Sequence, residues 1–401
     1  MNGIQLKTVS DSNTVWNSNF ILLLFSNIML YTGVYLLFPV LHRWGIYWHV
    51  DEFTSTFVAV AFGVGLFIPG VFNNYLVDRF SRKMVCRRSM LCFALVGLLY
   101  PYATGLWTIL TLRIVQGSLF GLVLMATGST LVIDVTPSRC RDKANVYFAY
   151  SGMVGMMLGL SLGMFFCASS EILSGSVLKV THCMLISAAF SFVSLLLVSL
   201  VKVSFRAPMD LPMLSFDRFL LKSDFVPGLN MMVIPLVLGM IIGSSYSSFF
   251  YLCVGTGLLA YLLVSRAINA GLSARVAVGI GLAMLLVGMY MLSFGHSTAF
   301  EHSAGVMIGF GTGLSIYRFL KIMVKMPLHC ERGTGYHTYQ LMWELSMMIG
   351  ISFGHYYCVT QVENPYNMVT WVVLVGFLLF VFYEYPHFKK VMYKRDSNGN
   401  N

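Results

Sequence analysis

Long apolar segments recur along the chain, and each one ends at charged residues, a proline or a polar cluster. A helix needs roughly 20 mostly apolar residues to cross about 30 Å of hydrocarbon, and it satisfies its own backbone hydrogen bonds there. The pattern therefore predicts an all-α integral membrane protein with twelve transmembrane helices. The predicted helices cover residues 19–42, 53–77, 84–104, 107–133, 144–168, 180–203, 226–248, 250–271, 275–295, 302–324, 338–359 and 366–385.

The most polar stretch of the interior, residues 204–224, separates the first six predicted helices from the last six. We therefore predict an N-terminal six-helix bundle over 1–203, a cytoplasmic linker over 204–224 and a C-terminal six-helix bundle over 225–401. Residues 1–18 are polar and show neither a basic n-region nor a small-residue cleavage site. The first apolar segment is therefore expected to be a membrane helix rather than a cleaved signal peptide.

The positive charge of the chain is distributed very unevenly between the predicted loops. The net charge is +10, yet all but three of the 26 Lys and Arg residues fall in alternate loops or termini. Basic loops face the cytoplasm, so both termini are predicted to be cytoplasmic. The exceptions are Arg43 and Lys179 in predicted outer loops and Arg113 inside a helix. This placement explains the basic charge by topology, and we expect no nucleic-acid partner.

Composition supports a membrane protein and offers no cofactor motif. Hydrophobic residues make up 57% of the chain and charged residues 10%, with a mean hydropathy of +0.75, whereas soluble domains carry about a quarter charged residues. The eight cysteines show no CxxC spacing and are predicted to be reduced and structural. No Walker A motif is present, so ATP is not expected to drive the protein, and no cofactor or metal is predicted.

The loop after the second predicted helix carries a recognisable motif. It reads Asn74-Tyr-Leu-Val-Asp78-Arg79-Phe-Ser81-Arg82-Lys83. It resembles the loop motif G-x-L-a-D-R-x-G-R-K of the major facilitator superfamily, with both glycines replaced. The resemblance implies two pseudo-symmetric six-helix bundles, and we expect Asp78, Arg79, Arg82 and Lys83 to form a latch between them. The alternative is that the basic residues only set topology while Asp78 caps a helix.

The fourth predicted helix contains a second motif, Arg113-Ile-Val-Gln116-Gly117. It is similar to the R-x-x-q-G motif of the same superfamily. A charge within the membrane is costly, so Arg113 needs a partner or a polar cavity, and we predict that Arg113 and Gln116 face the substrate cavity. The alternative is that the long side chain reaches the nearby interface.

A weaker resemblance points to a bacterial efflux-permease-like branch of the superfamily. It rests on the segment 211–228 and on Ser265-Arg266 in the eighth predicted helix. The antiporter signature, in contrast, is incomplete, because Met156 and Leu160 stand where proline would follow glycine in the fifth predicted helix. The direction of transport therefore stays open.

Glu344 is the acidic residue placed most clearly within a predicted helix. His337, Gln340, Glu344 and His355 share one face of that helix, and such a polar face is not expected to point toward lipid. Arg266 and Arg318 fall at a similar depth in the C-terminal bundle. One hypothesis is that Glu344 pairs with one or both arginines and that its protonation loosens an inner gate. The alternative is a static structural ion pair.

Candidate substrate contacts lie on the helices that line the central cavity in this superfamily. Asn27, Tyr31 and Tyr35 repeat at helical spacing in the first predicted helix, and Ser245 and Tyr246 lie at the end of the seventh. Aromatic residues near helix ends are also common interface anchors, and this alternative applies most to Tyr246.

These features together predict a secondary active transporter of a small solute that works by alternating access. Protons are the expected coupling ion, the expected location is the cytoplasmic (inner) membrane, and a monomer is expected. Efflux of drugs or metabolites and uptake of a small nutrient are both open. Two further alternatives are a non-transporting membrane sensor or scaffold and a membrane-embedded enzyme, although the sequence contains no HExxH or GxSxG motif and we expect no enzyme.

Overall fold

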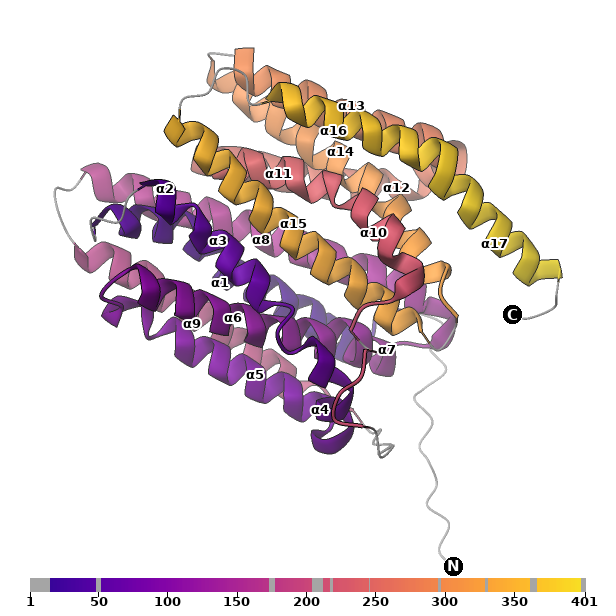
Figure 1. Cartoon of the computed structure of the whole chain (residues 1–401), viewed down its shortest axis with the longest axis horizontal. Helices are drawn as coiled ribbons and strands as arrows, with labels where there is room; N and C mark the ends of the chain where they lie inside the picture. Colours follow the sequence, from indigo (N-terminus) through magenta and orange to yellow (C-terminus); the bar gives the residue numbers. More distant parts are fainter. Residues whose placement is uncertain are drawn as a thin grey trace, which may run out of the picture.

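The computed structural model describes residues 15–47, 52–172, 177–203, 212–216, 219–244, 246–294, 297–328, 331–360 and 366–397, and these ranges contain helices and no strand (Figure 1). The N-terminal half comprises α1 (Ser18–Tyr47), α2 (Glu52–Ser55), α3 (Phe57–Gly65), η1 (Gly70–Phe72), α4 (Asn73–Phe80), α5 (Arg82–Gly97), η2 (Tyr100–Tyr102), α6 (Leu106–Ala126), η3 (Thr127–Leu131), α7 (Val132–Val135), η4 (Ser138–Cys140), α8 (Arg141–Ile172) and α9 (Val177–Leu200).

The C-terminal half has the same helical character. It comprises η5 (Lys222–Asp224), α10 (Phe225–Met231), α11 (Val233–Gly243), α12 (Ser248–Gly271), α13 (Ala274–Phe294), α14 (Thr298–Lys325), α15 (Arg332–Thr360), α16 (Tyr366–Leu379), η6 (Phe380–Glu384) and α17 (Tyr385–Ser397). The described cysteines are all free, and Cys330 lies outside the described residues.

The predicted membrane helices agree with the structure. Within the described ranges, 10 helices are long and apolar enough to cross a membrane, and the bent pair α10 and α11 makes an eleventh candidate. The remaining prediction, residues 338–359, corresponds to α15, which is 29 residues long but carries the polar face noted above. Its polar side chains are buried in protein, with exposures of 1% for His337, 4% for Gln340, 0% for Glu344 and 9% for His355.

A proline explains why the seventh predicted helix is bent. The axes of α10 and α11 differ by 42°. Pro235 lies in the first turn of α11, where it has no N–H to donate to Met231 four residues earlier, and its ring crowds that carbonyl. The regular helix therefore ends at Met231 and restarts at Val233.

The fourth predicted helix contains a π-helical turn, Thr127–Leu131, between α6 and α7. Its hydroxyl groups bond back to carbonyls one turn earlier. Thr127 Oγ1 donates to Val123 O at 2.7 Å, and Ser129 Oγ donates to Met125 O at 2.5 Å. Such bonds compete with regular helical pairing and favour a local bulge. The bulge lies against α15 of the other half of the molecule.

The helices form two bundles that lie side by side (Figure 1). In the first half, α1 packs against α8 and α9 while α5 and α6 pack on each other; in the second, α11 packs on α15 and α12 on α14. The bundles meet mainly where α15 contacts α3 and where α8 contacts α12 and α14. The bundle boundaries at residues 203 and 225 stay a prediction.

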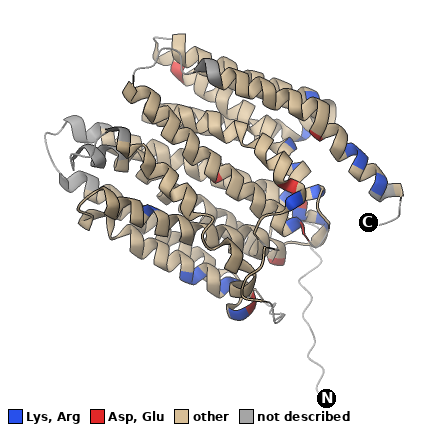
Figure 2. Cartoon of the chain, in the orientation of Figure 1, with Lys and Arg blue, Asp and Glu red and all other residues tan. Residues whose placement is uncertain are grey.

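Lys and Arg gather at one end of the molecule (Figure 2). We call this the basic end and define it by Arg82, Arg139, Arg266, Lys325 and Lys390. The opposite end is defined by Trp107, Ser248 and Glu301. The two ends correspond to the two sides of the membrane in the predicted topology.

Candidate functional site between the bundles

Glu344 joins the two bundles through a hydrogen bond deep in the protein. It lies on α15 and is fully buried, at 0% exposure. Tyr35 on α1 donates its hydroxyl proton to Glu344 Oε2 at 2.7 Å. Tyr31, one turn earlier on α1, stacks on Tyr35 with ring centroids 6.0 Å apart. A titratable carboxyl group therefore takes part directly in the contact between the bundles.

The hypothesis that Glu344 pairs with Arg266 or Arg318 is wrong for this conformation. Arg318 Nη2 donates instead to Leu272 O at 3.1 Å, and Arg266 is exposed at the basic end. Glu344 faces α1, whereas Arg318 faces the start of α13. Glu344 and Arg318 therefore have different partners, Tyr35 and the Leu272 carbonyl.

A small cavity lies between the bundles beside this hydrogen bond. Its volume is about 10 Å³, close to the space for one water-sized sphere. Two of the predicted substrate contacts, Asn27 and Tyr31, line it. The full lining, mostly aromatic, is Asn27, Tyr31, Phe148, Ala149, Met153, Tyr336, Tyr339, Gln340 and Trp343.

Several polar groups around this cavity have no hydrogen-bond partner among the described residues. They are the hydroxyl groups of Tyr336 and Tyr339 and the Oε1 atom of Gln340, all on α15. Each unsatisfied buried polar group costs about 1–3 kcal/mol. Asn27, by contrast, donates through Nδ2 to Phe148 O and Ser151 Oγ, both at 2.9 Å. The α15 side of the cavity is therefore the side with free hydrogen-bonding capacity.

Arg113 and Gln116 do not line this cavity; they lie nearer to the opposite end within the N-terminal bundle. Arg113 is fully buried, which excludes a side chain that reaches the interface. Its guanidinium lies over the rings of Phe38, at 4.3 Å, and Phe62, at 4.7 Å. Arg113 Nη1 donates to Gln116 Oε1 at 3.0 Å, while Nε and Nη2 have no hydrogen-bond partner among the described residues. Stacking on aromatic faces compensates part of the cost of burying this charge.

The loop motif ties helices of the N-terminal bundle to one another. Arg82 forms an ion pair with Asp134, and Lys83 Nζ donates to Ser199 O at 2.9 Å and Val201 O at 2.6 Å. The latter two carbonyls lie at the C-terminal end of α9, where a cation is favourable. Asp78 and Arg79 end α4, with Asp78 partly buried and Arg79 exposed.

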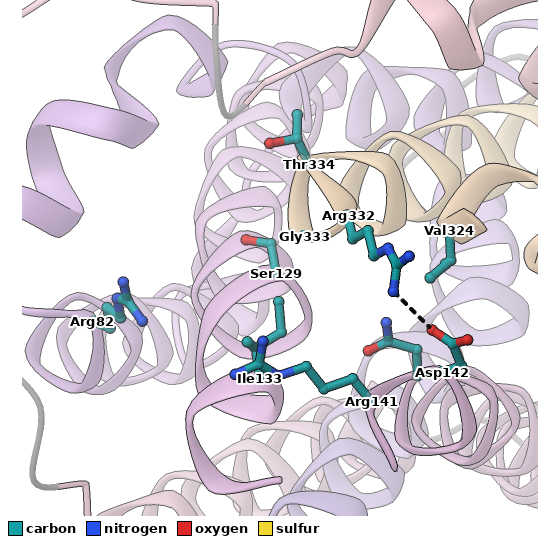
Figure 3. Close-up of a pocket in the computed structure, with 10 residues that line it drawn as sticks. Arg82, Ser129, Ile133, Arg141, Asp142, Val324, Arg332, Gly333 and Thr334 are labelled. Carbon is teal, nitrogen blue, oxygen red and sulfur yellow. Dashed lines mark ion pairs between the residues drawn. The ribbon is translucent and has the colours of Figure 1, made fainter. Parts of the chain in front are cut away.

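The ion pairs that join the two bundles involve a residue that the sequence did not single out. Asp142 on α8 lies 3.3 Å from Lys325 Nζ and 3.9 Å from Arg332 Nη1. Figure 3 shows Arg332 pointing toward Asp142 across a cavity of about 230 Å³ at the basic end, with Arg141 and Arg82 on its other side. A contact between the bundles at this end therefore exists, but it is centred on Asp142.

Part of the predicted linker is held against both bundles. Ser215 N donates to Val71 O at 2.9 Å, and Asn74 Nδ2 donates to Ser215 Oγ at 3.0 Å. Further along, Leu221 N donates to Thr338 Oγ1 on α15 at 2.9 Å. Asn74 is one of the two residues that replace glycines of the family motif, and its side chain is used to hold the linker.

The last two candidate substrate contacts are Ser245 and Tyr246. Ser245 lies outside the described residues. Tyr246 lies near the opposite end, where its N–H donates to the Tyr251 hydroxyl at 3.2 Å and its ring packs 4.9 Å from that of Phe250. Tyr246 does not line the small cavity described above.

Sequence reasoning also missed two buried acids. Asp224 is 0% exposed at the start of α10, and Glu384 is 3% exposed in η6. Glu384 falls inside a predicted membrane helix, so its position already carried a signal. Asp224 ends the predicted linker, where a carboxylate normally faces water, and no sequence signal marked it as buried.

Comparison with known proteins identifies the class that this architecture defines. The family model of the Major Facilitator Superfamily matches residues 23–351. The chain belongs to this superfamily of membrane transporters of small solutes.

Two curated relatives are similar over part of their length. One is the Multidrug resistance protein 2 of Bacillus subtilis, 26% identical over 159 residues, or 40% of this chain and 38% of the relative. The other is the 4-hydroxybenzoate transporter PcaK of Pseudomonas aeruginosa, 28% identical over 121 residues, or 30% of this chain and 26% of the relative. The similarity thus spans well under half of each relative.

Solved structures with the same fold match almost the whole chain. The human organic anion transporter MFSD10 (TETRAN) aligns with a TM-score of 0.67 at 15% identity, covering 90% of this chain and 98% of that one. A point mutant of the nucleoside transporter NupG aligns with a TM-score of 0.63 at 12% identity, covering 90% of this chain and 99% of that one. At such identities the match establishes the fold alone.

Proposed function

We propose that the chain is a proton-coupled secondary transporter that exports a small aromatic or apolar solute across the cytoplasmic membrane, with its basic end in the cytoplasm. The observation that carries the proposal is the hydrogen bond from Tyr35 to Glu344. It places an ionisable group on the surface where the bundles must separate during alternating access.

Protonation of Glu344 changes the strength of this contact between the bundles. An ionised carboxylate accepts a hydrogen bond roughly twice as strong as a neutral acceptor does. Proton binding therefore weakens the attachment to Tyr35 and favours bundle separation, whereas proton release favours the closed arrangement seen here. Coupling then requires that Glu344 takes up its proton from one side of the membrane and releases it to the other side.

The lining of the small cavity supports an aromatic or apolar solute. Its wall contains Tyr31, Phe148 and Trp343, and its free hydrogen-bonding groups are the neutral ones of Tyr336, Tyr339 and Gln340. Apolar walls with a few polar groups are typical of small-molecule sites. The cavity of about 10 Å³ must widen when the bundles separate to admit such a molecule.

The test uses the purified protein in liposomes with an imposed pH gradient and ethidium or 4-hydroxybenzoate as probes. A gradient of one pH unit drives up to about tenfold accumulation per proton exchanged. Glu344→Gln keeps the size and the hydrogen-bond acceptor but cannot ionise, so gradient-driven accumulation should be lost while probe exchange without a gradient persists.

Three outcomes separate the alternatives. Unchanged gradient-driven accumulation in Glu344→Gln contradicts a coupling role for this residue. Accumulation in the same direction as proton movement contradicts export by exchange and indicates uptake. No flux of any tested solute, combined with specific binding, indicates a sensor.

A further inference from the structure

A larger cleft opens between the bundles at the basic end, next to the cavity of about 230 Å³, with which it shares Asp142 and Val324. Its volume is about 480 Å³. It lies between the first turns of α8 in the N-terminal bundle and the last turns of α12 and α14 in the C-terminal bundle. The transport mechanism proposed above does not use it.

The cleft is a wedge because α8 and α12 touch toward the opposite end and diverge toward the basic end. At the opposite end Ser248 Oγ donates to Ser161 O at 2.7 Å. Closer to the basic end, the rings of Tyr150 and Tyr261 stack with centroids 6.1 Å apart, and they form the narrow end of the wedge. Beyond this pair of rings the two helices no longer contact each other closely enough to fill the space.

The wedge carries an excess of positive charge contributed by both bundles. Its basic lining residues are Arg139 and Lys143 on the N-terminal side and Arg266, Lys321 and Lys325 on the C-terminal side. Asp142 is the one acidic residue among the described residues that line it, and it is already paired with Lys325 and Arg332. The ion pairs found in the described part of the chain leave Arg139, Lys143, Arg266 and Lys321 without an acidic partner. Such a concentration of like charge in a cleft attracts an anion.

The surroundings of the wedge indicate that this anion belongs to a lipid. Beside it, α12 presents an apolar surface to the bilayer, with Leu263 86% exposed and Leu259 46% exposed. Tyr147, another lining residue, lies with its ring 4.9 Å from that of Trp16, and such aromatic pairs are typical of the headgroup level. Basic pockets between membrane helices on the cytoplasmic side are known to suit anionic headgroups.

We propose that this wedge binds the phosphate headgroup of an anionic phospholipid, with the acyl chains along Leu259 and Leu263. One phosphate can then be held by Lys143 of one bundle and Arg266 of the other. Because both bundles contribute, the lipid binds best at the separation seen here. It therefore stabilises this conformation relative to one in which the wedge widens or closes.

The experiment measures binding of dioleoylphosphatidylglycerol to the purified full chain, by native mass spectrometry and by the rise in thermal unfolding temperature as the lipid is added. Dioleoylphosphatidylcholine should give little or no rise. In Lys143→Gln/Arg266→Gln, phosphatidylglycerol binding should weaken roughly thirtyfold, since each basic residue near the surface contributes a factor of about five to six.

A matched double variant distinguishes binding in the wedge from a general attraction of the lipid to positive charge at the basic end. Lys390→Gln/Lys394→Gln removes the same charge from α17, which lies at the same end but outside the wedge, and should retain wild-type binding. Equal weakening in both double variants overturns the proposal. The charge-preserving pair Lys143→Arg/Arg266→Lys should bind like wild type, and loss of binding there would show that the wedge variant acts through folding.

The last arm distinguishes the source of the phosphate. Glycerol 3-phosphate carries the same anion without acyl chains and should raise the unfolding temperature far less than the lipid does. An equal rise, abolished by the wedge variant, overturns the lipid assignment and identifies a site for a soluble anion.

Discussion

At the basic end, Asp142 of the N-terminal bundle pairs with Lys325 and Arg332 of the C-terminal bundle. At the opposite end, the described residues join the same two bundles through uncharged groups. There, Ser352 Oγ donates to Thr56 O at 2.5 Å, and Ser55 Oγ lies 3.2 Å from His355 Nε2. Both ends therefore hold direct contacts between the bundles, and these contacts differ in their chemistry.

This difference determines which conditions can open each end. Ion pairs that are partly exposed weaken with salt, since screening acts over about 8–10 Å at physiological ionic strength. Neutral hydrogen bonds and close helix packing respond little to salt. The basic end should therefore respond to salt, anions and charged headgroups, and the opposite end mainly to changes in side-chain size.

The largest expected effect comes from overpacking toward the opposite end. Gly63 on α3 faces α15, and a Cβ atom built on it lies 3.1 Å from Met348 Cβ. Gly63→Phe should destabilise the contact between the bundles at the opposite end by about 2 kcal/mol. The ratio of separated to contacting molecules at this end should then rise roughly thirtyfold. The measurement is the distance between spin labels at Trp107→Cys and Phe294→Cys, which are 81% and 69% exposed in the native chain.

The control for this prediction is a glycine with free space around it. Gly271 at the end of α12 has nothing within 4 Å of a built Cβ atom, so Gly271→Phe should leave the label distances unchanged. Identical distance distributions in Gly63→Phe and wild type would show that the α3–α15 contact does not hold the opposite end closed. The exposed native thiols Cys92 and Cys358 are replaced by Ser in all labelled proteins.

The second prediction concerns the charge pairs at the basic end. Asp142→Asn removes the ion pairs of this residue with Lys325 and Arg332. The equilibrium between contact and separation of the bundles at the basic end should then shift toward separation by about 1 kcal/mol, or roughly fivefold, because exposed pairs contribute up to about 1 kcal/mol each. Labels at Arg87→Cys and Lys390→Cys report the separation. High salt should produce the same shift in wild type, and Asp142→Glu should not.

Comparison with the labels at the opposite end makes this prediction specific. If salt changes both label pairs equally, the contrast between a charged and an uncharged end is wrong. If salt changes neither pair, the Asp142 pairs do not contribute to closure.

The sequence predicted the helices well because their signal is local. Twenty apolar residues in a row can satisfy backbone groups in a bilayer only as a helix, so the position of each helix follows from composition alone. The burial of Glu344 followed in the same way, because a carboxylate on an otherwise apolar helix cannot face lipid at low cost.

The partners of these residues could not be predicted because spacing places a residue on a helix face but does not tell which helix that face meets. Arg318 bonds to the Leu272 carbonyl rather than to Glu344, and Tyr35, the observed partner, is 309 residues away from Glu344. Asp142 was missed for a related reason. In a basic loop, an acid that pairs across the interface has the same sequence pattern as one that faces water.

The third prediction concerns Ser81, which stands where the family motif has its second glycine. Ser81 has φ 66° and ψ 146°, and it is the non-glycine residue with positive φ in the described part of the chain. Glycine adopts such a backbone without steric cost, so Ser81→Gly should raise the free energy of unfolding by about 1 kcal/mol. Thermal unfolding in detergent measures the change.

The matched control places the same substitution in a regular helix. Ser303 is exposed in the body of α14, where Ser303→Gly should lower stability by about 0.5 kcal/mol. A destabilised Ser81→Gly protein would mean that this backbone conformation is not adopted. Because the loop lies within one bundle, Ser81→Gly should leave the label distances at both ends unchanged.

The smallest expected effect comes from Asn74, which stands where the family motif has its first glycine. This prediction tests whether the linker contributes to the contact between the bundles at the basic end. Asn74→Gly removes the hydrogen bond to Ser215 Oγ, worth about 0.5 kcal/mol, so amide exchange in residues 212–216 should rise roughly twofold. Ser215→Ala should give a similar rise, and the double variant should add little, because both changes remove one bond. Additive effects would show that Asn74 and Ser215 act independently, and the glycine of the family motif would then have been replaced for a reason other than holding the linker.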